Sequence, residues 1–222
     1  MENNIKIVKE LYSDRWEKVK NDMKESMSIG LKKWEKDVIT FFPKNSRILD
    51  IGCGTGREAI CLHDMGFTVT AIDISEEAIK MAKELAIETN RPIEFILTDG
   101  LSLPFNDNTF DIVIIWAQTF GLFYGAENQR SNLKECHRVL KEGGILSFSG
   151  HNKEFVELNT PPQYVDGKKL FFYTDTSCYW ELFTIPEIIE LAEKEGFTVL
   201  DCKSDVVFNE NEKPIIHCVC RK

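Results

Sequence analysis

Apolar and polar residues follow two periods along the chain, and the period changes repeatedly between residues 46 and 196. Short apolar runs of strand length alternate there with stretches in which apolar residues recur every three or four positions. The strand-like runs cover 46–51, 67–73, 93–97, 110–115 and 145–150. The helix-like stretches cover 57–65, a segment opened by Ser75, 128–141 and 186–195. Strands that alternate with helices predict an α/β fold with a doubly wound, mainly parallel sheet.

The end of the chain departs from this alternation. A strand pattern at 197–206 is followed by the polar turn 209–212 and a second strand pattern at 214–221, with no helix between them. Two strands joined by a short turn pair antiparallel. We therefore expect a seven-stranded sheet with an antiparallel last strand and with helices on both faces.

The remaining segments suggest how one domain of 1–222 is organised. Residues 1–45 form an N-terminal helical cap, with helix patterns at 4–24 and 28–42. Residues 46–150 form the cofactor-binding core, and 184–222 form the last helix and the hairpin. Residues 151–183 are an insertion with eight of the 24 aromatic residues: Phe155, Tyr164, Phe171, Phe172, Tyr173, Tyr179, Trp180 and Phe183. This insertion is either a lid over an apolar pocket or a set of paired strands that bury their own aromatics, or both.

A glycine turn is the strongest local signal. Residues 47–58 read Arg-Ile-Leu-Asp-Ile-Gly-Cys-Gly-Thr-Gly-Arg-Glu, with three alternating glycines between a buried strand and a helix. Glycine lacks the Cβ that keeps a ligand away from backbone N–H groups, and the helix N-terminus favours an electronegative ligand. The third glycine comes one residue earlier than in the dinucleotide-binding pattern. The spacing therefore speaks against an NAD-dependent oxidoreductase.

Carboxylates follow three of the predicted parallel strands, where ligands of open α/β sheets bind. Asp73 ends the second strand and can accept hydrogen bonds from both hydroxyls of a ribose. Asp99 follows the third strand and can accept from the exocyclic amine of adenine, or it forms an Asp-Gly turn. Asp50 precedes the glycine turn, where it either contacts the ligand or bonds to the loop backbone.

The segment Leu49-Asp50-Ile51-Gly52-Cys53-Gly54-Thr55-Gly56 resembles the first motif of the class I S-adenosylmethionine-dependent methyltransferases. Residues 138–144 also resemble the turn by which that family enters its fifth strand, whereas Arg57 and Glu58 replace the small or polar residues often found after the glycines. The resemblance covers 46–150 and, more loosely, the whole chain. It implies S-adenosylmethionine as the cofactor and the same seven-stranded sheet with its last strand reversed.

The resemblance also implies roles for individual residues. The motif that includes Asp50 and Gly56 supplies the turn, in which Gly52, Cys53 and Gly54 approach the methionine part of the cofactor. Asp73 holds the ribose, and Ile74 lies on the adenine. The adenine edge is read by Asp99, Gly100 and Leu101, and the methionine end is lined by Trp116 and Ala117. Tyr12 resembles an element whose hydroxyl reaches the cofactor carboxylate, although packing would also explain it.

Methyl transfer from a sulfonium needs an aligned acceptor, and it needs a base where the acceptor carries a proton. His151 directly follows the predicted fifth strand, so it is the candidate catalytic base at the pocket rim, with a structural histidine as the alternative. The aromatic insertion favours an apolar or aromatic small-molecule acceptor. The leading hypothesis is a small-molecule methyltransferase. A tRNA or protein methyltransferase and a non-catalytic S-adenosylmethionine-binding regulator are the alternatives.

Charge and composition narrow these hypotheses. The net charge is −9, and residues 48–222 carry 16 Lys and Arg against 28 Asp and Glu. Such an acidic domain repels a phosphate backbone, so nucleic acid is an unlikely partner. The seven cysteines form no Cys-x-x-Cys pair, so we expect no metal site and a reducing, cytoplasmic location. No apolar run approaches the roughly 20 residues of a membrane span, and the N-terminus carries no signal-peptide pattern.

Overall fold

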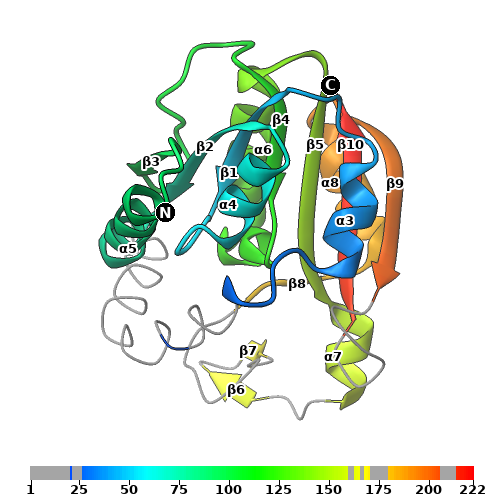
Figure 1. Ribbon diagram of the computed structural model, residues 1–222. Helices are drawn as coiled ribbons and strands as arrows, with labels where there is room; N and C mark the ends of the chain where they lie inside the picture. Colours follow the sequence, from blue (N-terminus) through cyan, green and yellow to red (C-terminus); the bar gives the residue numbers. More distant parts are fainter. Residues whose placement is uncertain (1–20, 22–26, 160–162, 166–167, 171–179, 206–213) are drawn as a thin grey trace.

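The structure is a computed structural model (Figure 1), and it describes residues 21, 27–159, 163–165, 168–170, 180–205 and 214–222. The predicted helix at 4–24 lies almost wholly outside these residues. The predicted helix at 28–42 is shorter in the structure, where α3 covers Lys33–Ile39. Lys32 has an extended backbone with φ −68° and ψ 162°, so the helix begins only at the next residue.

One large sheet forms the centre of the molecule, with the strand order β3-β2-β1-β4-β5-β10-β9 (Figure 1). Its strands are β1 (Arg47–Ile51), β2 (Thr68–Asp73), β3 (Glu94–Leu97), β4 (Phe110–Ile115), β5 (Leu140–Asn152), β9 (Thr198–Asp205) and β10 (Ile215–Arg221). Strands β1 to β5 pair in parallel, and β10 is antiparallel to both β5 and β9. The prediction of a mainly parallel sheet with a reversed last strand is confirmed.

The insertion contributes three short strands among the described residues. The short strand β8 (Leu182–Phe183) pairs in parallel with the end of β5, at His151 and Asn152. Strands β6 (Gln163–Val165) and β7 (Lys168–Leu170) form a separate antiparallel pair. Because β8 and β10 flank its end, β5 continues two residues beyond the predicted limit of 150. His151 therefore lies within β5 instead of directly after it.

Helices cover both faces of the sheet, and a separate hydrophobic cluster lies beneath each set. The helices are α4 (Arg57–Asp64), α5 (Glu76–Glu88), α6 (Ala126–Val139), α7 (Lys153–Asn159) and α8 (Ile185–Lys194), with the 3-10 helix η1 at Thr119–Leu122. One cluster contains Trp34 of α3, Leu62 of α4 and Ala82 of α5. The other contains Leu133 of α6 and Ile188 of α8. Figure 1 shows the same division, which confirms the doubly wound architecture.

Local sequence sets where two of these helices begin. Ser75 is the N-cap of α5, and its hydroxyl accepts a hydrogen bond from the Ala78 N–H at 3.2 Å, as the sequence predicts. Thr184 and Glu187 form a reciprocal capping box at the start of α8. Among the described residues no helix is long and apolar enough to cross a membrane.

An aromatic contact attaches α3 to the sheet. The Trp34 ring is stacked on the His217 imidazole of β10 at 5.3 Å between ring centroids, and Trp116 meets it edge-on at 5.5 Å. The Trp34 Nε1 and both imidazole nitrogens of His217 are buried with no hydrogen-bond partner among the described residues. Burial, reinforced by the Lys203 charge and partly offset by nearby aspartates, lowers the pKa of His217. His217 is therefore held neutral in the folded protein.

This contact makes stability depend on pH. The unfolded chain protonates His217 below about pH 6.5 whereas the folded chain resists protonation, so the free energy of unfolding falls as the pH is lowered through that value. The His217→Phe variant keeps the ring contact and removes this proton. Urea unfolding at pH 7.5, 6.5, 5.5 and 4.5 should show that the variant loses up to about 1.4 kcal/mol less per pH unit than the wild type in the acid range. Parallel pH curves would contradict the assignment.

Candidate functional site

A cavity of about 250 Å³ lies at the carboxyl ends of β1, β2, β3 and β4. Most of the residues predicted to bind the cofactor line it, and the structure therefore brings together Gly52, Cys53, Gly54, Asp73, Ile74, Asp99 and Gly100. Ala117, Thr119, Leu122 and Phe123 close the cavity on the side of β4. Of the other predicted residues, Asp50, Gly56, Leu101 and Trp116 do not line the cavity, and Tyr12 lies outside the described residues.

The glycine turn is attached directly to the neighbouring strand. The N–H groups of Gly52 and Cys53 both donate to the Ile72 carbonyl of β2, at 2.8 and 3.0 Å. Gly52 has a φ of +79°, and a Cβ at this position would lie 2.2 Å from Thr119 Cγ2. Only glycine fits between the turn and η1. Gly56 serves packing instead, because it is the N-cap of α4 and lies against the Phe95 ring.

Asp73 is held in place by the backbone on both sides. Its Oδ2 accepts from the Gly54 N–H and its Oδ1 from the Ser75 N–H, both at 2.8 Å. Burial raises the pKa of this carboxyl, and the N–H donors of Ser75, Gly54 and Ile74 oppose that shift. A carboxylate offers about four acceptor positions. At least one acceptor position of Asp73 therefore remains for a ligand hydroxyl.

Asp99 is oriented by its own turn. Its Oδ1 accepts from the Leu101 N–H at 2.9 Å, and its side chain is exposed at the cavity wall. The Leu101 N–H, which the resemblance places at the adenine edge, is thereby already engaged. What this turn offers a ligand is the second oxygen of Asp99.

Two predicted residues lie beneath the cavity. Asp50 is buried, its Oδ2 has no hydrogen-bond partner among the described residues, and within that part of the chain no hydrogen bond joins its side chain to the loop backbone. Burial raises the pKa of the Asp50 carboxyl well above its usual range, and the Glu58 charge adds to the shift. The Trp116 side chain belongs to the core, where its Nε1 donates to Ser147 Oγ at 2.8 Å and its ring stacks on Phe42. The adjacent Ala117 lines the cavity in its place.

A buried ionic cluster beside the cavity was not predicted. Arg57 donates to both carboxylate oxygens of Glu35, at 2.9 and 2.8 Å, to the Gly30 carbonyl at 2.6 Å, and to Glu58. Burial alone would lower the pKa of Arg57, but the two carboxylates outweigh it and raise that pKa. The cluster joins the segment before α3 to the first turn of α4. Arg57 and Glu58 also line the cavity, together with Lys32.

The segment after β4 forms one wall of the cavity. Ala117 and Gln118 both have left-handed backbones, with φ of 50° and 62°, which is uncommon for residues other than glycine. The Gln118 N–H donates to Ser149 Oγ at 3.1 Å. Gln118 Nε2 is sheltered from solvent and has no hydrogen-bond partner among the described residues. An unpaired buried donor of this kind costs about 1–3 kcal/mol.

The candidate base His151 is only 3% exposed and is not among the residues that line the cavity. Its ring meets the Trp180 ring edge-on at 5.7 Å. Trp180 in turn lies over η1, where its Cδ1 would be 3.2 Å from a Cβ at Gly121. Of the aromatic insertion, Phe183 packs into the core against Phe120. The side chains of Tyr164, Phe171, Phe172, Tyr173 and Tyr179 lie outside the described residues.

Comparison with known proteins agrees with this geometry. Residues 49–148 match a family described as a methyltransferase domain. The chain is 29% identical over 181 residues to the putative methyltransferase YqeM of Bacillus subtilis, which covers 81% of this chain and 71% of that relative. It is 38% identical over 140 residues to the ubiquinone/menaquinone biosynthesis C-methyltransferase UbiE of Rickettsia prowazekii. That match covers 57% of this chain and 55% of the relative. The chain thus spans about half the length of the second relative.

A solved structure with the same fold covers nearly the whole chain. It is the 1,6-didemethyltoxoflavin-N1-methyltransferase of Burkholderia thailandensis, with bound 1,6-didemethyltoxoflavin and S-adenosylhomocysteine. The TM-score is 0.70 at 19% identity, and the match covers 99% of this chain and 86% of that chain. At this level of identity the similarity establishes the fold.

The ionic cluster gives the prediction for this site. Arg57→Met keeps the aliphatic stem but removes the guanidinium from the buried carboxylates of Glu35 and Glu58, and it leaves Glu35 with the longer ion pair to Lys32 at 3.9 Å. We expect the free energy of unfolding to fall by about 3–5 kcal/mol at pH 8, as measured in urea. The deficit should be smaller at pH 5, because burial already raises the pKa of Glu58 and its carboxyl can then take up a proton.

Arg91→Met is the matched control. Arg91 also binds a carboxylate with two nitrogens, at 2.7 and 2.8 Å to Asp64, but that pair lies on the surface. Surface pairs contribute little to stability, so this variant should change far less. Equal losses in the two variants would show that Arg57 does not hold a buried cluster together.

Proposed function

Since the chain belongs to the class I S-adenosylmethionine-dependent methyltransferases, we propose that it transfers the methyl group of this cofactor to a small-molecule acceptor. The observation that carries the proposal is the placement of Asp73 and Asp99. They lie at the ends of adjacent strands, on one cavity with the glycine turn. A single bound S-adenosylmethionine would account for the placement of both carboxylates and of the glycine turn.

The cofactor would lie across the strand ends in one orientation. Asp73 keeps at least one acceptor position for the ribose hydroxyls. Ile74 also lines the cavity, where an adenine ring could pack on it. The second oxygen of Asp99 would face the exocyclic amine, and the backbone from Gly52 to Gly54 would lie along the methionine part. This order follows the order of the strands in the sheet.

Methyl transfer requires mainly that the acceptor is aligned with the methyl group of the cofactor. When bound, the cofactor supplies an electrophilic methyl group on a sulfonium, and the thioether that remains after transfer is a good leaving group. The protein holds the acceptor in line at the methionine end, and such alignment can supply about 7–11 kcal/mol of the barrier. Ala117 and Thr119 line this end of the cavity, and η1 rests directly on the glycine turn through Thr119 and Gly52. The acceptor side is thus fixed relative to the cofactor side.

We propose an apolar ring with an oxygen substituent, such as a hydroquinone, as the acceptor. The name of one relative refers to ubiquinone and menaquinone biosynthesis, and the solved relative holds 1,6-didemethyltoxoflavin. Gln118 does not itself line the cavity, but it lies between Ala117 and Thr119, which do, and its sheltered Nε2 has no partner among the described residues. An acceptor oxygen that reached this donor would satisfy it. The acidic character of residues 48–222 argues against a tRNA substrate. His151 does not line the cavity and its ring meets Trp180 edge-on, so we assign it a supporting role there and no contact with the acceptor.

A cytoplasmic location belongs to the same proposal. Six cysteines are unpaired thiols among the described residues, which suits a reducing compartment.

Ligand binding tests the proposal first. Thermal melts with S-adenosylhomocysteine, S-adenosylmethionine and NAD should show stabilisation by the two adenosyl ligands and none by NAD. Incubation with methyl-labelled cofactor and a panel of reduced naphthoquinones and benzoquinones should then transfer label to at least one of them. Stabilisation by NAD alone would overturn the assignment. Binding of the adenosyl ligands without turnover on any tested acceptor class would favour the regulator hypothesis.

Asp73→Asn tests the ribose assignment. The amide keeps the shape of the side chain, but it loses the charge and replaces one acceptor oxygen by a donor. Each hydrogen bond to a charged group is worth about 1.5–3 kcal/mol, so S-adenosylhomocysteine should bind at least about 100-fold more weakly in calorimetry. Asp64→Asn, at the exposed end of α4, is the control and should bind as the wild type does. An unchanged dissociation constant for Asp73→Asn would refute the assignment.

Gln118→Leu tests the acceptor side. The variant removes the sheltered donor while keeping similar bulk, so KM for the oxygenated acceptor found in the screen should rise about tenfold. The dissociation constant of S-adenosylhomocysteine should stay unchanged. An unchanged KM, or an equal loss of cofactor affinity, would remove Gln118 from the acceptor site.

A further inference from the structure

We propose that Asn132 of α6 is a positioning residue that orients the Asp99 carboxylate and thereby gives the site its preference for adenine over a 6-oxopurine. The proposal rests on the function proposed above, since it concerns how that site reads its cofactor. Asn132 does not line the cavity, and it carried no signal in the sequence. It acts through a single peptide group.

The connection runs through the peptide between Gly100 and Leu101. Asn132 Nδ2 donates to the Gly100 carbonyl at 2.8 Å. The Leu101 N–H, on the other side of the same peptide group, donates to Asp99 Oδ1 at 2.9 Å. A peptide group is planar, so a bond that fixes the direction of its carbonyl also fixes the direction of its N–H. Asn132 therefore determines where the Asp99 carboxylate can be held.

The burial of Asn132 supports this role. Its exposed fraction is 0%, and it lies on the face of α6 that packs against the sheet beside Leu133 and Cys136. A buried amide is unfavourable unless it is hydrogen-bonded, and an aliphatic residue would fill the same space without that requirement. Among the described residues, its other contact is a weak one at 3.8 Å, from the Cys136 thiol to Oδ1. The strong bond of this side chain goes to the turn.

The turn has little freedom to adopt another conformation. Gly100 is buried and has a φ of +73°, and a Cβ there would lie 3.1 Å from the Phe123 ring and 3.3 Å from Ile51. Phe123 itself lines the cavity. The peptide is thus clamped between the cavity wall on one side and the Asn132 amide on the other.

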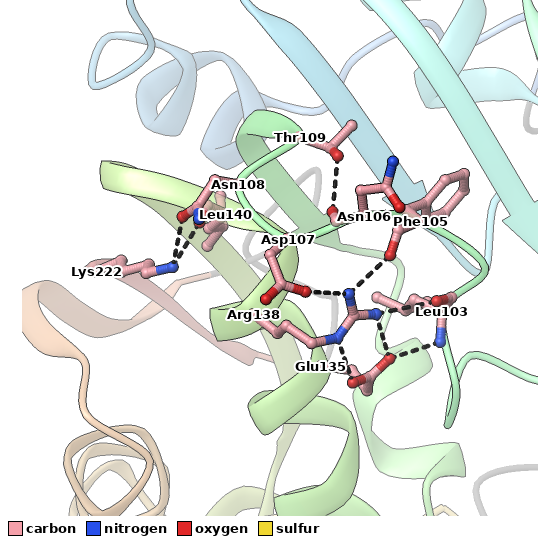
Figure 2. A network of polar contacts seen from close by, with 10 residues as sticks. All are labelled: Leu103, Phe105, Asn106, Asp107, Asn108, Thr109, Glu135, Arg138, Leu140 and Lys222. Carbon is pink, nitrogen blue, oxygen red and sulfur yellow. Dashed lines mark hydrogen bonds and ion pairs between the residues drawn. The ribbon is translucent and has the colours of Figure 1, made fainter.

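The next turns of α6 hold the chain that follows. Figure 2 shows Glu135 and Arg138 facing residues 103–107. Glu135 Oε2 accepts from the Leu103 N–H at 2.8 Å, and Arg138 donates to the carbonyls of Leu103 and Phe105 at 3.0 and 2.7 Å. Positions three apart lie on one face of a helix, so Asn132, Glu135 and Arg138 form one polar row. Asn132 thus holds the loop of residues 100–105 at Gly100, and Glu135 and Arg138 hold it at Leu103 and Phe105.

The chemistry of the purine edge explains the expected preference. Asp99 Oδ1 is engaged by the Leu101 N–H, which leaves the other oxygen for the ligand. That oxygen accepts from the 6-amino group of adenine, whereas a 6-oxo group in the same place is itself an acceptor and is repelled. A carboxylate held in one orientation enforces this difference. A carboxylate free to rotate would lose much of it.

Calorimetric titration with S-adenosylhomocysteine and S-inosylhomocysteine tests the proposal. We expect the wild type to prefer the adenosyl ligand by at least about tenfold, the value of one hydrogen bond to a charged group. Asn132→Leu, which conserves shape, should reduce the preference to about threefold or less, chiefly through weaker binding of the adenosyl ligand. Should this variant fail to fold, Asn132→Ser replaces it, since serine is too short to reach the Gly100 carbonyl. Lys134→Met, on the exposed side of α6, is the control and should keep the wild-type preference.

Asp99→Asn separates the possible failures. If the wild type does not bind S-adenosylhomocysteine, the proposed function itself fails. If the wild type shows the preference and Asp99→Asn loses it while the Asn132 variants keep it, the positioning role alone is wrong. A loss of affinity by the same factor for both ligands in the Asn132 variants would also overturn that role, because it would indicate general destabilisation of the pocket. A reduced preference in the Asn132 variants supports the proposal.

Discussion

The pair of hydrogen bonds from Gly52 and Cys53 to the Ile72 carbonyl is the contact on which the rest of the site depends. It joins the glycine turn of β1 to the last residues of β2, so Asp73 can accept from the Gly54 N–H on the opposite side of the same turn. The absence of a side chain at Gly52 then admits Thr119, and with it the whole of η1, against the turn. Three strand ends are thereby brought to one cavity by backbone geometry alone.

A buried ionic cluster closes the cavity beside the glycine turn. Glu35, Arg57 and Glu58 are nearly inaccessible to solvent, and a buried pair of this kind is weak evidence for net stability. Its contribution is directional instead: the Arg57 guanidinium binds Glu35 and the Gly30 carbonyl at once, which fixes the segment before α3 beside the cavity. The neighbouring Trp34 contact carries the hydrophobic part of the same attachment.

Sequence reasoning succeeded where the relevant contacts are local. The strands, the glycine turn, the Ser75 cap and the reversed last strand follow from periodicity and short-range chemistry, and the carboxylates at strand ends follow from topology. It failed where the partner is distant in the chain. The bonds from Arg57 to Glu35 and from Asn132 to Gly100 span 22 and 32 residues. An arginine or an asparagine in the sequence does not indicate which distant residue it will bind. His151 was predicted to follow the fifth strand directly, but it lies within β5. The strand β8, which extends the pairing of β5, is only two residues long and could not be recognised in the sequence.

The two faces of the sheet thus support opposite ends of one cavity. On one face, α3 and α4 hold the end beside the glycine turn through Arg57, and on the other face α6 holds the turn at Asp99 through Asn132. Between them lies the segment of Ala117 and Gln118, whose left-handed backbones are held by one bond to Ser149 and by the contact of Thr119 with Gly52. If the cofactor binds at the strand ends as proposed, the segment after β4 can change without disturbing the residues that hold the cofactor.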